Sequence, residues 1–206
     1  MRDKCAIVEI HYLPAISYFS ALKNIDTIIL ERFENFAKQS YRNRCLINTS
    51  QGLAPLTVPL TDKHGKVFIK DIRIDYSQKW LNNHWRTIQT AYGNAPFFEY
   101  YSSELHEILF KKFEFLFDLD YHLLSLCLKW LKWEKIIQET LTYNHSMSDC
   151  IDLRNVINVK KRDENIVDRS VVPYTQVFGN MFVPDLSIID LVFCTGPQAN
   201  KYITPS

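Results

Sequence analysis

Glycine is scarce in this sequence. Five glycines are spread over 206 residues, which leaves no flexible linker of the kind that separates two domains. No stretch reaches the roughly 18 consecutive apolar residues that a helix needs to cross a bilayer. Since 47% of the residues are hydrophobic, the chain can bury one substantial core. We therefore predict a single domain over residues 1–206 and no membrane insertion.

An excess of charge of either sign is also absent. Lys and Arg number 24 against 23 for Asp and Glu, a net charge of +1, so no nucleic-acid partner is expected. The five cysteines lie far apart without a CxxC pair, which predicts neither a metal site nor a disulfide framework. Cys5, Cys127 and Cys194 lie in apolar runs, so we expect them to be buried free thiols. Together with an N-terminus that lacks a signal-peptide pattern, this predicts a cytoplasmic protein.

The order of apolar runs and turn residues predicts an α/β fold. We expect a single domain with a mixed sheet that contains an N-terminal Rossmann-like βαβ unit, plus a helical middle segment. The βαβ unit comprises a strand at 5–10, a helix starting near Pro14 and a strand at 27–31. Further expected elements are a hairpin at 44–60, a strand at 67–75, a helix at 77–92, a helical tract at 97–135 interrupted near 118–120, a strand at 139–143 and a helix at 188–193. The polar stretch 158–171 is interpreted as a surface loop, either a lid or a solvated linker.

His11 is the first candidate site residue. It follows a predicted buried strand and precedes a predicted helix. Ligands of open α/β sheets bind at such strand ends, and imidazole titrates in the range that a general base needs. His84 is a second candidate base, although its neighbours Trp80 and Trp85 favour a core histidine that bonds to a carbonyl.

Arg42 and Arg44 are candidate anion-binding residues. Period-two alternation in a strand starting at Tyr41 places both guanidinium groups on one face, and a guanidinium fork suits phosphate or carboxylate. The structural alternative is a salt-bridge network with Glu31, Glu34 or Asp26. Asp190, inside an apolar predicted helix, requires a partner such as Arg, Lys or a backbone donor, since a lone buried carboxylate is costly.

Several motifs in order resemble the WbqC-like protein family of bacteria. They are His11-Tyr12-Leu13-Pro14, the stretch 38–44, Leu56-Thr57-Val58-Pro59, Trp80 to His84-Trp85, Tyr92 to Ala95-Pro96-Phe97-Phe98, and the segments 174–178 and 182–191. Cys194 departs from the family's closing pattern, where Asn is expected. The resemblance covers nearly the whole chain and implies one WbqC-like domain of a cytoplasmic protein encoded in surface-polysaccharide (O-antigen) clusters.

The resemblance implies transfer of an amino acid such as glycine, or of another acyl group, onto a sugar-derived acceptor. The substrate would be a small molecule or sugar nucleotide that carries phosphate or carboxylate. His11 and His84 are then the candidate catalytic residues. The candidate substrate-binding residues are Tyr12, Lys38, Gln39, Arg42, Asn43, Arg44, Tyr92, Gln176 and Asp190.

Two other functions remain open at this point. A strand leading into His11 is similar to the start of nucleotidyltransferase-like enzymes, although the second histidine of their His-x-x-His pair is missing. A non-catalytic binding or assembly protein is the third alternative, because the sequence contains no P-loop and no nucleophile motif. The sequence predicts no metal ligands and identifies no cofactor, donor, acceptor or oligomeric state. Convergence of His11, Arg42, Arg44 and His84 on one pocket would favour an enzyme.

Overall fold

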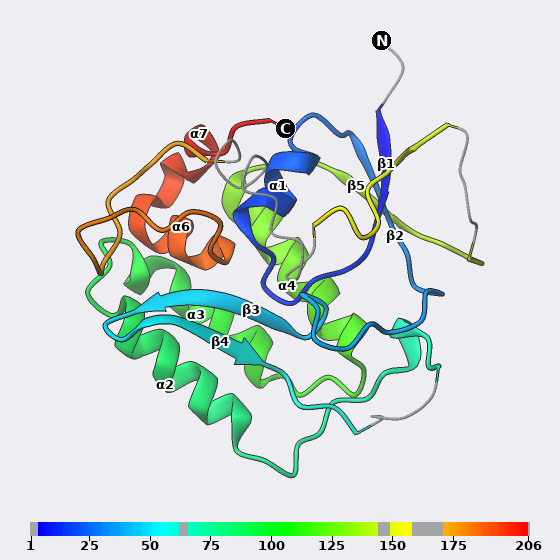
Figure 1. Cartoon of the computed structure of the whole chain (residues 1–206), viewed down its shortest axis with the longest axis horizontal. Helices are drawn as coiled ribbons and strands as arrows, with labels where there is room; N and C mark the ends of the chain where they lie inside the picture. Colours follow the sequence, from blue (N-terminus) through cyan, green and yellow to red (C-terminus); the bar gives the residue numbers. More distant parts are fainter. Residues whose placement is uncertain (1–3, 62–65, 144–148, 158–170, 206) are drawn as a thin grey trace.

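The computed structural model describes residues 4–61, 66–143, 149–157 and 171–205. The N-terminal strand belongs to a four-stranded parallel sheet (Figure 1). In sheet order its strands are β5 (Ile136–Glu139), β2 (Thr27–Leu30), β1 (Cys5–Val8) and β6 (Ile151–Asp152). The two central strands, β1 and β2, are short apolar runs with little exposure, as parallel strands covered on both faces require. Helix α1 (Ile16–Leu22) connects them, so the predicted α/β class and βαβ unit are confirmed.

A separate antiparallel hairpin follows the βαβ unit. Strands β3 (Arg44–Thr49) and β4 (Gly52–Thr57) pair in register from Arg44 opposite Thr57 to Thr49 opposite Gly52. The turn needs Gly52 because its φ of +95° lies in the left-handed region that favours glycine. The parallel and antiparallel strands of the mixed α/β fold are thus divided between two sheets.

Helices form the other side of the core. The hairpin crosses in front of α2 and α3 (Figure 1), and α4 packs against α3, α6 and the 3₁₀ turn η1. Buried residues occur all along α4, which identifies it as a central helix of one contiguous apolar core. The helical elements are α2 (Trp80–Tyr92), α3 (Phe98–Phe110), α4 (Leu116–Leu131), α6 (Ile188–Thr195), α7 (Ala199–Tyr202), η1 (Ile69–Asp71) and η2 (Gly196–Gln198).

Three expected elements differ in the structure. The strand expected at 67–75 is η1 with isolated bridges on either side, and η1, which contains the buried Ile69, packs against α4. The helical tract is interrupted at 111–115 rather than near 118–120. The strand expected at 139–143 lies at Ile136–Glu139, since α4 already ends in a left-handed residue at Lys132 (φ 57°). Of the loop expected at 158–171, residues 158–170 lie outside the described part of the chain.

The cysteines differ from the prediction at one pair. Cys5 and Cys150 form a disulfide with their Cα atoms 4.9 Å apart, so the expectation of a free Cys5 and of no disulfide was wrong. The two residues meet because Cys5 begins β1 and Cys150 directly precedes β6, its parallel neighbour. Cys45, Cys127 and Cys194 are free; Cys127 is buried, as predicted, and Cys194 is half-buried.

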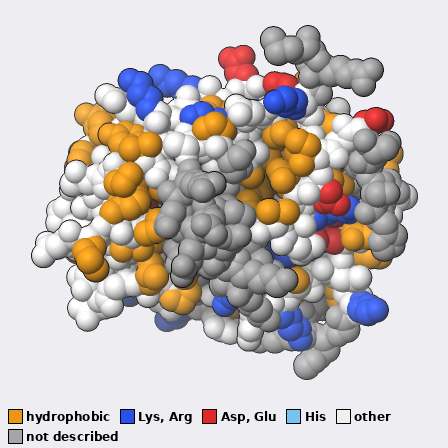
Figure 2. Space-filling view, turned by 45° about the horizontal axis from the view of Figure 1, so that its top comes forward, with side chains coloured by type: hydrophobic (Ala, Val, Ile, Leu, Met, Phe, Trp, Pro, Cys, Tyr) orange, Lys and Arg blue, Asp and Glu red, His pale blue; other side chains and the backbone are white. Residues whose placement is uncertain are grey.

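The surface carries charges of both signs. Figure 2 shows Lys and Arg side chains, Asp and Glu side chains and separate hydrophobic patches interspersed on one face. Among the helices that the structure describes, none combines the length and the apolar character required to cross a membrane.

Candidate functional site

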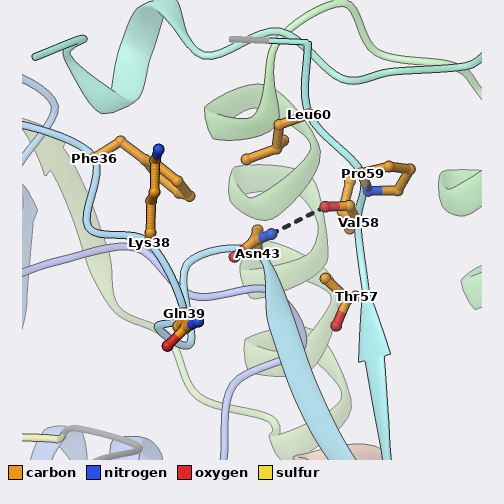
Figure 3. A pocket seen from close by; sticks show the side chains of 8 residues that line it. All are labelled: Phe36, Lys38, Gln39, Asn43, Thr57, Val58, Pro59 and Leu60. Atoms are coloured by element: carbon orange, nitrogen blue, oxygen red, sulfur yellow. Dashed lines mark hydrogen bonds between the residues drawn. The ribbon is translucent and has the colours of Figure 1, made fainter. Parts of the chain in front are cut away.

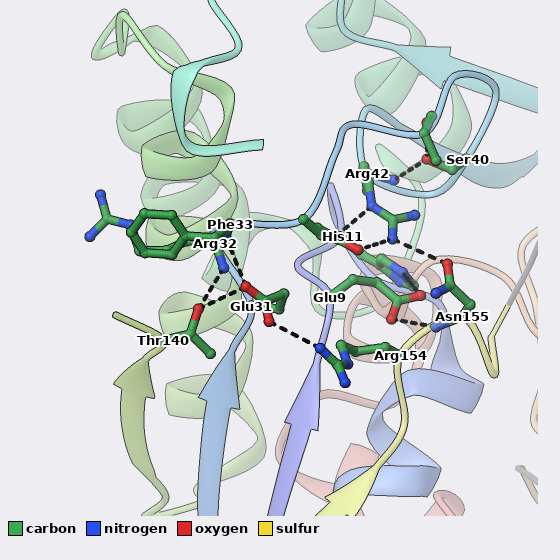
Figure 4. Close-up of polar contacts among 12 residues, drawn as sticks. Glu9, His11, Glu31, Arg32, Phe33, Ser40, Arg42, Thr140, Arg154 and Asn155 are labelled. Atoms are coloured by element: carbon green, nitrogen blue, oxygen red, sulfur yellow. Dashed lines mark hydrogen bonds and ion pairs between the residues drawn. The ribbon is translucent and has the colours of Figure 1, made fainter. Parts of the chain in front are cut away.

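Two glutamates occupy equivalent positions at the carboxyl ends of the central strands. Val8 pairs with Leu30 at the end of the β1–β2 ladder, and Glu9 and Glu31 are the residues that follow. Both carboxylates are almost fully buried, at 2% and 0% exposure. Buried carboxylates are costly unless they are paired, and several polar side chains surround these two (Figure 4). We call this group the strand-end network; it comprises Glu9, His11, Glu31, Glu34, Arg42, Thr140, Asp152, Arg154 and Asn155.

His11 and Glu9 form a dyad within the strand-end network. Nε2 of His11 lies 3.3 Å from a Glu9 carboxylate oxygen, and the second oxygen of Glu9 accepts the backbone N–H of Asn155 at 2.8 Å. The imidazole packs against the rings of Tyr18 and Tyr41. Its Nδ1 is buried and has no hydrogen-bond partner among the described residues. Because an ionised carboxylate only accepts hydrogen bonds, Nε2 carries the hydrogen in neutral His11 and Nδ1 has the free lone pair.

The charges around Glu9 keep it ionised. Burial acts to raise the pKa of Glu9, but the hydrogen bond and charge of His11, the charge of Arg42 and the Asn155 N–H together hold this pKa below its ordinary value. An ionised carboxylate beside an imidazole orients the ring and stabilises its protonated form, as in the acid–base pairs of many enzymes.

Arg42 lies on the other side of the dyad. Its Nε and Nη2 atoms each donate to a different oxygen of Glu34 at 2.7 Å, and Nη2 also donates to Oδ1 of Asn155 at 3.4 Å. Burial raises the pKa of Glu34, and the guanidinium opposes that rise. The salt-bridge alternative for Arg42 therefore holds: Glu34 takes both arms of its guanidinium fork.

Arg154 provides the second buried guanidinium. It donates to Glu31 at 3.1 Å and makes two hydrogen bonds to Asp152, at 2.9 and 2.6 Å, and it lies 5.0 Å from the Tyr143 ring centroid. Glu31 also accepts from Thr140 at 2.8 Å. The Asp152 side chain is 41% exposed, whereas those of Glu31 and Glu34 are buried. Asp152 is thus the partner that an anionic ligand can replace with the smallest change in the core.

The strand-end network is closed around His11. His11 is 1% exposed, and the small cavity beside it, lined by residues including Val8, Glu9, Tyr18 and Leu153, is too small for a water molecule. Among the described residues, no three His, Cys, Asp or Glu side chains are arranged to hold a metal ion. A ligand at Nδ1 of His11 therefore requires some displacement of the surrounding side chains.

His84 and Tyr12 form a separate contact beneath the hairpin. The Tyr12 hydroxyl lies 3.1 Å from Nδ1 of His84, and Trp80 packs edge-on against the imidazole. Burial lowers the pKa of His84 to about 4, although a hydrogen bond to the Thr57 backbone acts in the opposite direction. His84 is therefore neutral at physiological pH, in surroundings that match its alternative interpretation as a satisfied core histidine.

Lys38, Gln39 and Asn43 line a pocket of about 290 Å³. Figure 3 shows them opposite Val58, Pro59 and Leu60, with the Asn43 amide donating to the Val58 carbonyl at 3.0 Å. The prediction that Arg42 and Arg44 share one face of a strand was wrong, because β3 begins only at Arg44; Arg42 pairs with Glu34, whereas Nη2 of Arg44 donates to the Gln39 carbonyl at 2.5 Å. This bond supports Gln39 in a left-handed conformation (φ 56°).

Tyr92, Gln176 and Asp190 lie together in a fourth place. The Asp190 carboxylate accepts from Tyr174 at 2.5 Å, Tyr92 at 3.0 Å and Gln176 at 3.1 Å. We call these four residues the Asp190 cluster. The expectation that Asp190 has a partner is confirmed, but the donors that it meets are neutral side chains instead of the expected Arg, Lys or backbone group. Burial accordingly raises the pKa of Asp190 despite the three hydrogen bonds.

The structure thus distributes the candidate residues over four surroundings. Only His11 and Arg42 belong to the strand-end network, so His11, Arg42, Arg44 and His84 do not converge on one pocket. Sequence reasoning assigned no role to Glu9, Arg154 and Asn155. The signal for Glu9 was available, since Val8-Glu9 and Leu30-Glu31 both place a glutamate directly after an apolar strand. Arg154 and Asn155 carry no comparable local signal.

A parallel α/β protein with a buried, charged network at its strand ends is the class that fold and site define. The chain belongs to the WbqC-like protein family, whose model matches residues 10–166 and 164–202. It is also similar to the uncharacterized protein Rv1507c of Mycobacterium tuberculosis (strain ATCC 25618 / H37Rv), with 28% identity over 228 residues that cover 97% of each chain. No solved structure matches the chain significantly.

Proposed function

We propose that this protein is a transferase that moves an amino acid such as glycine, or another acyl group, onto a sugar-derived acceptor. We place the reaction in bacterial surface-polysaccharide (O-antigen) biosynthesis in the cytoplasm, with residues 1–206 acting as one domain. The observation that carries the proposal is the Glu9–His11 dyad, which lies at the carboxyl end of a parallel strand with Nδ1 of His11 lacking a partner among the described residues.

The dyad suits an acyl transfer to an amine or hydroxyl group. The acceptor's nitrogen or oxygen attacks the carbonyl carbon of an activated donor, and a C–N or C–O bond forms while the bond to the leaving group breaks. Nδ1 of His11 takes the acceptor's proton and returns it to the leaving group. Glu9 stabilises the imidazolium between these two steps.

Arg154 supports binding of the anionic part of the substrate. A phosphate or carboxylate replacing Asp152 would keep the guanidinium paired on both arms. Arg42 contributes in a different way, because Glu34 occupies its fork and its remaining contact is to Asn155. We therefore assign Arg42 to positioning Asn155 and Arg154 to substrate binding.

The test is a transfer assay with defined donor and acceptor classes. Acyl thioesters and aminoacyl adenylates are combined with nucleotide-linked amino sugars and hydroxy sugars, and mass spectrometry detects acceptors that gain one acyl group. His11→Gln should lower the rate by about 100-fold or more, the usual contribution of a general base, and Glu9→Gln should lower it less. The matched control is His122→Gln on α4, where His122 bonds to the Asp118 carbonyl away from the dyad.

A non-catalytic binding protein is the second candidate. Closure of the network and neutralisation of both guanidinium groups by carboxylates favour it. Binding of a nucleotide sugar without transfer of any donor would support this function, as would a transfer rate unchanged in His11→Gln.

A further inference from the structure

The Cys5–Cys150 disulfide lies at the base of the segment that completes the strand-end network. Cys5 is the first residue of β1, and Cys150 immediately precedes β6. The bond closes 145 residues of chain. Residues 151–157 follow directly, and this segment carries Asp152, Arg154 and Asn155.

The backbone pairing of this segment with the sheet is short. Strand β6 has two residues, and their pairing with Ala6 and Ile7 continues only to the hydrogen bond from the Leu153 N–H to the Ile7 carbonyl at 2.9 Å. Ile151 and Asp152 are exposed, so they contribute little apolar burial. Two-residue pairing at a sheet edge is weak by itself. Leu153 and Ile157 pack, partly buried, against the core, and Arg154 and Asn155 add the ionic and polar contacts described above.

We propose that Cys5 and Cys150 form a redox latch: the disulfide holds residues 151–157 on the strand-end network, and its reduction releases Arg154 and Asn155 from Glu31 and Glu9. In the expected cytoplasmic location, disulfides usually have transient or redox-sensing roles. The inference goes beyond the proposed transfer reaction and rests on it only in treating the strand-end network as the site that the latch controls.

The reductant is a dithiol protein or a small dithiol. One of its thiolates attacks a sulfur of the Cys5–Cys150 bond and forms a mixed disulfide, and the second thiolate then releases the other protein sulfur. Two electrons and two protons pass to the protein, which gains two thiols while the dithiol becomes a disulfide. The reverse exchange with an oxidised dithiol closes the latch.

The other cysteines do not compete in this exchange. Cys45 and Cys127 are buried, and burial raises the pKa of both thiols, which keeps them in the unreactive protonated form. Burial likewise raises the pKa of Cys194 to about 12. Cys5 and Cys150 are each only partly buried, so a dithiol can reach them with less rearrangement.

Hydrogen exchange of the whole protein tests the latch without a substrate. After equilibration with oxidised or reduced dithiothreitol, the Leu153 and Asn155 amides should exchange about tenfold or more faster in the reduced protein. Amides of the β3–β4 hairpin should keep their rates. The double variant Cys5→Ser with Cys150→Ser should behave as the reduced protein under both conditions. Cys194→Ser, which removes a free cysteine, should behave as the wild type.

Two results would overturn the latch. One is that Cys5 and Cys150 remain fully alkylatable after equilibration with oxidised dithiothreitol, so that no disulfide forms. The other is a disulfide that forms while exchange at Leu153 and Asn155 stays equal in both states. The wild-type comparison suffices if the double variant does not fold. A redox-dependent exchange without any transfer activity would remove the proposed function alone, whereas transfer with unchanged exchange would remove the latch alone.

Discussion

The strand-end network and the Asp190 cluster solve the same problem in opposite ways. Both bury carboxylates almost completely, but Glu34 meets a guanidinium whereas Asp190 meets two phenol hydroxyls and an amide. Charged partners favour an ionised carboxylate and depend strongly on one another. Burial raises the pKa of both carboxyls; at Glu34 the hydrogen bond and the charge of Arg42 oppose this rise, whereas at Asp190 only hydrogen bonds from neutral groups oppose it. The first arrangement pairs charges at the ends of β1 and β2, and the second joins α2, the segment 174–176 and α6 through neutral hydrogen-bond donors.

The largest expected effect comes from breaking the Arg42–Glu34 pair. Arg42→Met should lower the free energy of unfolding by about 3–5 kcal/mol, because it leaves the Glu34 carboxylate buried without a counter-charge. Urea unfolding at neutral pH measures the loss. Adding Glu34→Leu to the same chain should restore most of the stability, since the uncompensated charge is then gone. A loss below about 1 kcal/mol in the single variant would mean that the pair behaves like an exposed salt bridge.

His84, which is buried beside the neutral Tyr12 hydroxyl, should make the stability of the protein depend on pH. Its pKa is about 4 in the folded protein and about 6.5 in an unfolded chain, so the unfolded state binds more protons between these values. Stability should therefore fall as the pH decreases from about 6.5 to about 4, by roughly 3 kcal/mol in total.

Thermal or urea unfolding of wild type and His84→Gln over this pH range isolates the contribution. The variant should lack the His84 part of the slope. Equal slopes in the wild type and His84→Gln would show that His84 accepts a proton in the folded protein as readily as in the unfolded chain.

Asp190 should show the opposite pH dependence. Because its pKa is raised in the folded protein, the unfolded state loses this proton first, and stability should fall as the pH rises above about 3.8. Asp190→Asn cannot ionise and should flatten this part of the curve, at a cost of about 1 kcal/mol at acidic pH from imperfect hydrogen bonds. Burial raises the pKa of Glu34 as well, but its partner is charged: Glu34→Gln should be destabilising at neutral pH, because Arg42 then loses its counter-charge.

The sequence was sufficient for the centre of the fold and insufficient for its edges. The apolar runs of β1 and β2 and the turn at Gly52 carry local signals that match the structure. The isoleucines at 69, 72 and 74 carried a strand-like signal, but Ile69 lies in η1, which packs on a helix that begins more than 40 residues further along the chain. Tertiary packing determines such segments, and a local pattern cannot show it.

The site divides in the same way. Glu9 and His11 follow a strand that can be recognised in the sequence, so their place at the carboxyl end of a strand could be predicted. Arg154 reaches Glu31 across 123 residues, and Asn155 reaches Glu9 across 146. Their arrival depends on the two-residue pairing of β6, which has no periodicity of its own. The separation of Arg42 from Arg44 had a local cause, because Arg44 begins β3 while Arg42 precedes it.

The smallest expected effect comes from removing either phenol hydroxyl of the Asp190 cluster. Tyr174→Phe and Tyr92→Phe each remove one hydroxyl donor and should lower the free energy of unfolding by about 1 kcal/mol at neutral pH. Tyr100→Phe, at an exposed position, should leave stability unchanged. Each buried variant also leaves Asp190 with fewer donors, so its pKa should rise further and the loss should shrink toward acidic pH, where the carboxyl is protonated in both variants and wild type. Urea unfolding at pH 4 and pH 7 measures this difference. A loss of stability that is equal at both pH values would mean that Asp190 is already protonated at neutral pH. The Asp190 cluster would then differ from the strand-end network in ionisation as well as in its partners.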